Sequence, residues 1–251
     1  MGAVVARERR TDGDALRAAA PGRSYSYRDF ITTSYKAGNV LRYLGVRPGD
    51  EVLVVPDALP EPVLAFYGAA QLGAVTRFAE TVTDDPPRAV LAPVDRESEF
   101  DLPPGHRLAV HGGPPDDPAT THWEAEVWSE NPAVHPVDVA GSDPALVADD
   151  RTYTHAELLS GAARVAADAD LGPGDEMVVR GSLADPEVVV AGLLAPILVG
   201  ATIVFPAEST EATGGYASKE AAADTGDSHR TDHTVTATEI VESAPFEGGE
   251  N

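Results

Sequence analysis

The segment DSHRTDH, residues 227–233, gathers the side chains best suited to binding a metal. His229 and His233 are four residues apart, so on a helix they would share one face, with Asp227 and Asp232 beside them. Imidazole nitrogens and carboxylate oxygens in such a set can bind zinc. The surrounding sequence is polar and has no apolar periodicity, which favours adventitious spacing in a disordered segment. We therefore expect no metal site.

Motifs for nucleophilic or nucleotide chemistry are missing from the sequence. It contains no cysteine, which excludes disulfides, thiolate nucleophiles and cysteine-based metal centres. It has no Gly-x-Ser-x-Gly nucleophile elbow, no Gly-x-Gly-x-x-Gly dinucleotide motif and no Walker A motif. Acidic residues are so abundant that the sequence singles out no acid–base pair. No catalytic residue is predicted.

The net charge of the chain indicates the solvent in which it works more than it indicates a binding partner. Among 251 residues, 41 are acidic and 18 basic, for a formal net charge of −23, which disfavours a nucleic-acid partner. Lys36 and Lys219 are the only lysines. A lysine-poor surface of hydrated carboxylates favours a halophile with a salt-rich cytoplasm. An acidic protein of an ordinary cell is the alternative, and it would usually carry more lysine.

The location is predicted to be cytoplasmic, without a membrane segment. Charged residues begin within the first seven positions, so the N-terminus lacks the apolar stretch of a signal peptide. The uncharged stretch from Val188 to Pro206 has the length of a bilayer span, but it contains Gly192, Pro196 and Gly200 and lacks a basic flank on its C-terminal side. A buried helix, a turn and a strand explain this stretch better.

Three blocks of sequence occur twice, in the same order and about 127 residues apart, which indicates an internal repeat. The pairs are RSYSYRDF (Arg23–Phe30) with RTYTHAEL (Arg151–Leu158), VRPGDEVLVV (Val46–Val55) with LGPGDEMVV (Leu171–Val179), and LGAVTRF (Leu72–Phe78) with VGATIVF (Val199–Phe205). In each copy the blocks predict a helix, a Pro-Gly-Asp turn, a buried strand, a second helix and another strand. This order implies a parallel sheet with right-handed crossovers.

The predicted fold is α/β, with two Rossmann-like repeats and mainly parallel sheets. The elements expected are helices at Glu61–Gln71 and Pro186–Leu198, and strands at Val52–Val55, Met177–Val179, Thr202–Phe205, Ala89–Ala92 and Arg107–Val110. Trp123 and Trp128 are expected to be packing anchors. Residues 1–141 should form a first α/β subdomain, 142–206 a second, shortened one, and 207–251 an acidic disordered tail.

The repeats also resemble a known family. The block from Tyr25 to Phe78, YSYRDF…GVRPGDEVLVV…LGAVTRF, resembles the opening of adenylate-forming enzymes, the superfamily of acyl-CoA synthetases, peptide-synthetase adenylation domains and luciferases. The second copy, from Tyr153 to Pro206, is similar to the family's next subdomain. The resemblance implies ATP-driven conversion of a carboxylate to an acyl-adenylate, with Mg²⁺, usually followed by transfer to a thiol such as coenzyme A.

This sequence departs most from the family at the position of the phosphate loop. The family's Ser/Thr/Gly-rich loop and Pro-Lys-Gly correspond here to Ala145–Tyr153, which has no glycine and no lysine and carries Asp149 and Asp150. Two carboxylates would repel a phosphate. Asp185 aligns with the family's acyl pocket, where it would repel a carboxylate substrate, and the Tyr-Gly-x-Thr-Glu motif and lid lysine are not found.

Thr154 and His155 match the Thr-His pair that follows the family's phosphate loop, so the resemblance implies that they contact the ligand. The residues alone offer another interpretation. Thr154 can cap the following helix and form a capping box with Glu157, three residues later. Both interpretations remain open at the level of sequence.

These observations predict a degenerate, non-catalytic relative of AMP-dependent acyl-CoA synthetases. It would bind a small acyl or nucleotide ligand between the two copies, or a protein partner. The alternative is the N-terminal piece of a split acid–thiol ligase whose missing parts lie on a partner polypeptide, and a third possibility is a structural homodimer. ATP or AMP and Mg²⁺ would be cofactors only if the family activity is retained.

Overall fold

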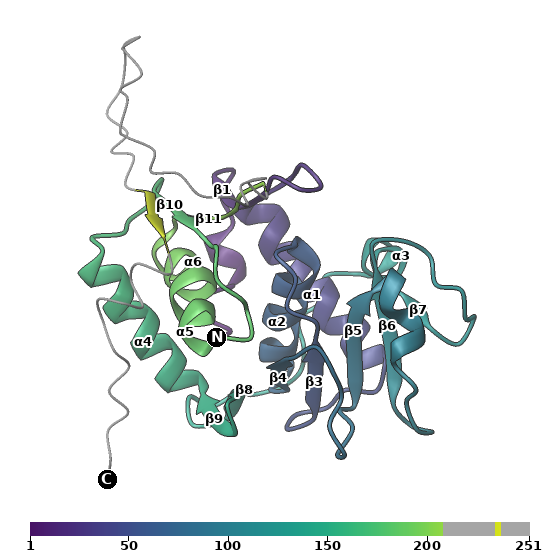
Figure 1. Cartoon of the computed structure of the whole chain (residues 1–251). Coiled ribbons are helices and arrows are strands. Elements are labelled where there is room, and N and C mark those ends of the chain that lie inside the picture. The colour runs from purple at the N-terminus through teal and green to yellow at the C-terminus, as the bar shows by residue number, and fades with distance from the viewer. Residues whose placement is uncertain (208–233, 237–251) are drawn as a thin grey trace, which may run out of the picture.

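The computed structural model describes residues 1–207 and 234–236, which form two separate β-sheets with helices packed on them (Figure 1). The larger sheet has seven strands in the order β7-β6-β5-β3-β4-β8-β9. The smaller has five, in the order β12-β10-β11-β1-β2. Neighbouring strands are parallel except in the hairpins β1–β2 and β8–β9, which confirms an α/β fold with mainly parallel sheets.

Every strand predicted from the sequence is present, within one residue at each end. The seven-stranded sheet contains β3 (Glu51–Val54), β4 (Val75–Phe78), β5 (Ala89–Pro93), β6 (Arg107–His111), β7 (Thr121–His122), β8 (Pro144–Ala148) and β9 (Arg151–Thr154). The five-stranded sheet contains β1 (Asp14–Ala18), β2 (Arg23–Ser26), β10 (Glu176–Val178), β11 (Thr202–Phe205) and β12 (Thr234–Thr236).

Each sheet takes strands from both sides of residue 141, because the two hairpins cross over. The first hairpin, β1–β2, joins β11 of the five-stranded sheet, with Leu16 beside Ile203. The second, β8–β9, joins β4 of the seven-stranded sheet, with Leu146 beside Thr76. Both hairpins have a register shift at the same place along the strand. The boundary between residues 141 and 142 therefore remains a prediction from the order of the repeats. In space, each sheet contains strands from both sides of that boundary.

The helices begin and end where local chemistry requires it. Helix α1 (Tyr27–Tyr43) is capped by Ser26, whose hydroxyl accepts a hydrogen bond of 3.1 Å from the backbone N–H of Asp29. Helix α2 (Pro60–Leu72) is buried along its whole length and ends at Gly73, whose φ of 69° suits a residue without a Cβ. The remaining helices are α3 (Trp123–Ser129) and α4 (His155–Asp168), with 3-10 turns η1 (Arg7–Arg9) and η2 (Val94–Glu99).

The helix expected at Pro186–Leu198 is not regular, and this expectation was wrong in detail. It consists of α5 (Pro186–Val188), the π-helical segment η3 (Val189–Leu194) and α6 (Ala195–Val199). Pro196 has no N–H to donate to the preceding turn and its ring crowds the carbonyl four residues earlier, so the chain widens before it. Gly200, with a φ of 89°, then turns the chain into β11. No helix in the described part of the chain is long and apolar enough to cross a membrane.

The halves of the chain meet through packed side chains. In Figure 1, α1 and α2 lie between the seven-stranded sheet and helices α4 to α6. The fully buried Tyr67 of α2 donates a hydrogen bond of 2.9 Å to the carbonyl oxygen of Leu193. Tyr27 of α1 donates one of 2.7 Å to the carbonyl oxygen of Ala201. A ligand cleft between the two copies was expected, but one continuous apolar core joins the halves at this contact.

Beyond residue 207 the structure describes only β12, which lies parallel to β10. The tail's composition did not predict this strand. The rest of the predicted tail, including His229 and His233, lies outside the described residues.

Candidate functional site

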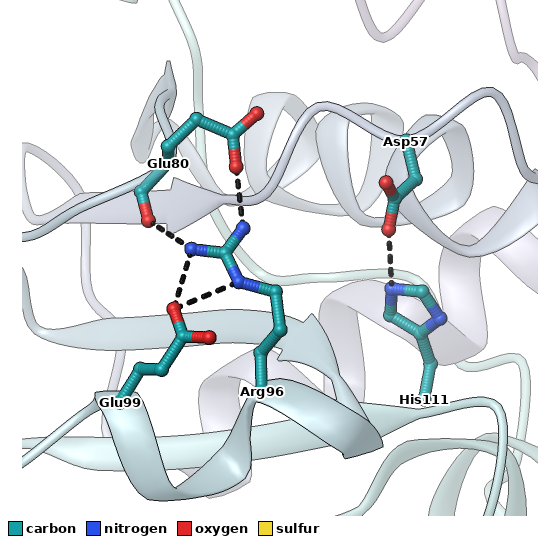
Figure 2. A network of polar contacts seen from close by, with 5 residues as sticks. All are labelled: Asp57, Glu80, Arg96, Glu99 and His111. Carbon is teal, nitrogen blue, oxygen red and sulfur yellow. Dashed lines mark hydrogen bonds and ion pairs between the residues drawn. The ribbon is translucent and has the colours of Figure 1, made fainter.

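Polar side chains gather at the carboxyl edge of the seven-stranded sheet, where loops follow parallel strands (Figure 2). Asp57 follows β3, Glu80 follows β4, Arg96 follows β5 and His111 ends β6. The carboxyl ends of parallel strands lie at one edge of a sheet, so loops distant in sequence bring these groups together. Such an edge is the usual place for a ligand in an open α/β sheet.

His111 is buried at the centre of this edge. Only 1% of the residue is exposed, and its Nε2 lies 3.7 Å from Oδ2 of Asp57, too far for a hydrogen bond. Burial lowers the pKa of His111, and burial raises the pKa of Asp57 with a further contribution from Glu80. The imidazole is therefore neutral near pH 7, and its contact with the Asp57 carboxylate is not a salt bridge.

Arg96 binds two loops together beside this pair. Its guanidinium donates hydrogen bonds to the carboxylate and the backbone carbonyl of Glu80, and to the Glu99 carboxylate at 2.8 Å. It also lies over the ring of Phe100, 5.7 Å from the ring centroid. Arg96 fixes the loops after β4 and β5, and each of its three nitrogens donates at least one hydrogen bond.

A cavity of about 580 Å³ opens next to this edge, between β2, α1, the start of α2 and α3. Arg23 of β2 pairs across it with Glu61, the second residue of α2. The Glu61 side chain is only 6% exposed, against 43% for Arg23. Burial raises the pKa of Glu61, and the nearby Glu124 carboxylate raises it further, while Arg23 opposes the shift.

Glu124 connects the cavity to the edge of the sheet. Its Oε1 accepts a hydrogen bond of 2.6 Å from the backbone N–H of Gly112, the residue after His111. Its Oε2 is shut off from solvent and has no hydrogen-bond partner among the described residues. The cavity and the strand ends thus form one polar region with Glu124 between them.

The two tryptophans of the chain both line this cavity. Trp123 is 1% exposed and is a packing anchor, as expected. For Trp128 that expectation was wrong, because its side chain is 86% exposed. The short helix α3 turns one tryptophan into the core and the other outward. The cavity therefore has an aromatic wall as well as charged groups.

Thr154 and His155, the two residues that the sequence offered as ligand contacts, do not line this cavity. Thr154 caps α4: its hydroxyl accepts a hydrogen bond of 3.2 Å from the N–H of Glu157, whose carboxylate accepts one of 2.8 Å from the N–H of Thr154. His155 is 1% exposed, and burial lowers its pKa to about 4. Their ligand role stays a prediction, whereas the capping geometry is observed.

The segment at the position of the family's phosphate loop is a tight hairpin turn. Asp149 and Asp150, with φ of 49° and 59°, connect β8 directly to β9, and Ala148 faces Arg151 in the ladder. Positive φ at both central residues is typical of a type I′ turn. A phosphate would meet two carboxylates on a turn with no glycine-rich cradle. The Asp149–Asp150 turn therefore does not fit the phosphate groups of a nucleoside triphosphate.

The residues of the cavity and the edge were not found from the sequence, although one signal was present. Three of them come within four residues of the end of a predicted strand: Asp57, Arg96 and His111. Listing polar residues at the ends of those strands would have found them. Arg23 and Glu124 could not be found in this way, because they reach the cavity through the crossed hairpin and through α3.

Comparisons with known proteins agree with this architecture. Residues 4–86 match the family model described as AMP-binding enzyme. A 4-coumarate–CoA ligase 2 from Oryza sativa subsp. japonica is 40% identical over 68 residues, which are 27% of this chain and 12% of that protein. A 3-hydroxybenzoate–CoA/4-hydroxybenzoate–CoA ligase from Thauera aromatica is 43% identical over 53 residues, 21% of this chain and 10% of that protein.

Solved structures show the same fold. ATP-bound MatB from Rhodopseudomonas palustris superposes with a TM-score of 0.68 at 15% identity, covering 82% of this chain and 44% of that one. The anthranilate–CoA ligase AuaEII, solved with anthranoyl-AMP, gives a TM-score of 0.70 at 18% identity with the same coverage. The fold is that of the N-terminal part of adenylate-forming ligases. The family-model match covers residues 4–86 alone, and the chain spans less than half the length of these structures.

Proposed function

We propose that this chain is a non-catalytic relative of the acyl-CoA synthetases that binds a small ligand and does not activate a carboxylate with ATP. The observation that carries the proposal is the Asp149–Asp150 turn at the phosphate-loop position. Adenylation needs preorganised donors around the leaving pyrophosphate, and this turn presents carboxylates there. The cavity at the carboxyl edge supports a binding role, because it combines charged groups with aromatic walls.

The proposal is tested by assaying the purified chain in molar KCl with ATP, Mg²⁺ and a panel of aliphatic and aromatic carboxylic acids. We expect no pyrophosphate release above the rate without protein, and no heat of ATP binding by calorimetry. A full-length acyl-CoA ligase active in the same salt serves as the positive control. Robust pyrophosphate release with any acid would overturn the proposal.

A second candidate is one part of a split acid–thiol ligase. The coverage of 44% of the MatB chain favours it, because a partner polypeptide could supply the remainder. Co-expression with a separate C-terminal ligase polypeptide should then give a stable complex with adenylation activity. If a complex forms but releases no pyrophosphate, the non-catalytic binding role is supported. If no complex forms, the split-ligase proposal is rejected.

We further infer that the protein works in a salt-rich cytoplasm. The chain has 41 acidic and 18 basic residues, which supports this inference. Closely spaced surface carboxylates repel one another until salt screens their charges.

A further inference from the structure

We propose that His135 is a latch that acid releases. Near neutral pH it holds the strap, which we define as residues 130–140 between α3 and β8, against helix α1, and it lets the strap open when the pH falls. The strap contains no helix or strand. This inference goes beyond the proposed function, and its test uses no ligand.

Side chains, and not a neighbouring strand, bind the backbone of the strap. Three successive carbonyl oxygens of the strap accept hydrogen bonds from the elements beneath it. Asn39 of α1 donates to Asn131 at 3.0 Å and to Ala133 at 3.2 Å. Arg7 of η1 donates to Pro132, which lies between them. Each such bond adds only a modest net stability, so the strap depends on what it buries.

His135 is the one strap residue whose side chain is buried, with 6% of the residue exposed. Its ring stacks on Tyr35 of α1, with 5.8 Å between the ring centroids. It fills a notch at Gly38, because a Cβ there would lie 2.5 Å from the imidazole Nε2. The same Cβ would lie 3.0 Å from the carbonyl oxygen of Gly68. His135 therefore covers the place where α1 and α2 cross.

The notch suits a neutral imidazole better than a protonated one. Both ring nitrogens of His135 are shut off from solvent and have no hydrogen-bond partner in the described structure. The neutral ring leaves one N–H unbonded there, whereas the protonated ring would leave two, together with a positive charge. Burial lowers the pKa of His135 to about 4, and the Arg42 guanidinium lowers it further.

The sign of the pH effect follows from this difference. In an open strap the imidazole meets water and has its ordinary pKa of 6.5. Between pH 6.5 and about 4 the open strap binds a proton that the closed strap does not bind. Falling pH therefore shifts the equilibrium toward the open strap, and rising pH closes it.

The charged groups on the elements beneath the ring are cations. Arg42 comes from α1, and Arg7 of η1 lies over the Tyr35 ring, 5.3 Å from its centroid. Gly68 of α2 brings no ionisable group to the notch. Of the strap's own carboxylates, one accepts a hydrogen bond from a backbone N–H and the other is exposed to solvent: Glu130 and Asp138. Protonation of the ring thus adds a positive charge beside other cations.

Thiol labelling tests the latch, because the chain has no cysteine and one introduced thiol reports on one place. Val139→Cys puts the thiol in the strap, and Ala92→Cys puts it in the buried strand β5. The rate of reaction with dithiodipyridine in molar KCl is divided into the rate for the urea-unfolded chain at the same pH, which gives a protection factor. From pH 7.5 to pH 5 we expect protection of the strap thiol to fall about tenfold or more. The core thiol should remain the better protected at both pH values.

Three substitutions, made in the strap reporter, identify the group that titrates. His135→Leu should abolish the fall in protection. His106→Gln is the matched control at a half-buried histidine, bonded at 2.7 Å to the carbonyl oxygen of Pro87, and should leave the fall unchanged. Arg42→Gln should make the fall smaller, because the pKa of His135 in the closed strap rises toward its ordinary value.

Circular dichroism checks that each variant is folded, and Arg42→Gln, at an exposed position, keeps the test decisive if His135→Leu does not fold. Equal protection of the strap and core thiols at pH 5 would mean that the whole chain unfolds, which overturns the inference. A fall in protection that persists in His135→Leu, or that Arg42→Gln leaves unchanged, would overturn it as well. None of these outcomes bears on pyrophosphate release, so the latch and the proposed function fail separately.

Discussion

The hydroxyl of Tyr27 donates a hydrogen bond of 2.7 Å to the carbonyl oxygen of Ala201, a residue 174 positions later in the chain. This buried contact ties the first residue of α1 to the turn before β11. Tyr27→Phe should lower the free energy of unfolding by about 1–2 kcal/mol, because a buried carbonyl loses its donor. Urea unfolding at fixed KCl measures the change. Tyr43→Phe, at a side chain that is 78% exposed, should have no comparable effect.

Helices α1 and α2 approach closely at a glycine pair. A Cβ on Gly68 would lie 2.6 Å from the backbone nitrogen of Gly38, where nothing flexible can move aside. We expect Gly68→Ala to destabilise the fold by about 1–3 kcal/mol through overpacking. Gly141→Ala is the matched control, since its Cβ would meet its nearest neighbour at 3.4 Å. Equal melting temperatures for the two variants would show that the helices can separate at low cost.

The Asp149–Asp150 turn is strained, because both residues have positive φ. Asn-Gly is the preferred pair for such a turn. Asp149→Asn with Asp150→Gly should therefore be more stable than Asp149→Asn with Asp150→Asn, by about 0.5–1 kcal/mol. The two double variants have the same charge, so chemical denaturation compares the backbone effect alone. A less stable glycine variant would contradict the assigned turn.

Buried neutral histidines should make the fold sensitive to acid. Burial lowers the pKa of His155 to about 4 in the folded chain, against an ordinary value of 6.5. The unfolded chain then binds more protons as the pH falls from about 6.5 to about 4, so this part of the stability is present above pH 6.5 and lost toward pH 4. Burial lowers the pKa of His135 to about 4 as well, with the same sign.

His155→Phe should flatten this pH dependence relative to the native chain. The measurement is the free energy of unfolding at pH 7.5 and pH 5, in the same KCl concentration. The slope should decrease for the variant even if its stability at pH 7.5 also changes. An unchanged difference between the two pH values would mean that His155 is not held neutral in the fold.

Salt should stabilise the native chain. Raising KCl to about 1 M shortens the screening length to about 3 Å, which reduces repulsion among carboxylates left by the net charge of −23. The melting temperature should rise steadily with KCl up to molar concentrations. A melting temperature that is flat or falls in this range would favour the ordinary acidic protein over the halophile.

Elements that depend on short stretches of sequence were predictable. Pro48-Gly49-Asp50 and Pro173-Gly174-Asp175 each precede a strand, and the two glycines have φ of 83° and 93°. The carboxylates of Asp50 and Asp175 each accept a hydrogen bond from the backbone N–H three residues earlier. These turns are fixed by their own residues, so their sequence is sufficient to identify them.

Other features depend on partners distant in the chain. Nothing local in DALRA, residues 14–18, indicates that it will pair with β11 and not with a neighbouring strand. The outward direction of Trp128 depends on how α3 lies against α1, and the widened turn before Pro196 depends on the buried space around it. The candidate cavity combines such features, which is why its residues were not predicted.

The crossed hairpins have a consequence for synthesis on the ribosome. The strand that begins at Asp14 leaves the exit tunnel long before Thr202–Phe205, its parallel neighbour, has been translated. The nascent chain can pair β1 with β2 early, but the other edge of β1, which contains Ala15 and Leu16, both fully buried in the finished fold, has no β11 beside it for most of translation. A truncated product ending before residue 202 would expose that edge permanently, which marks it for a chaperone or a protease.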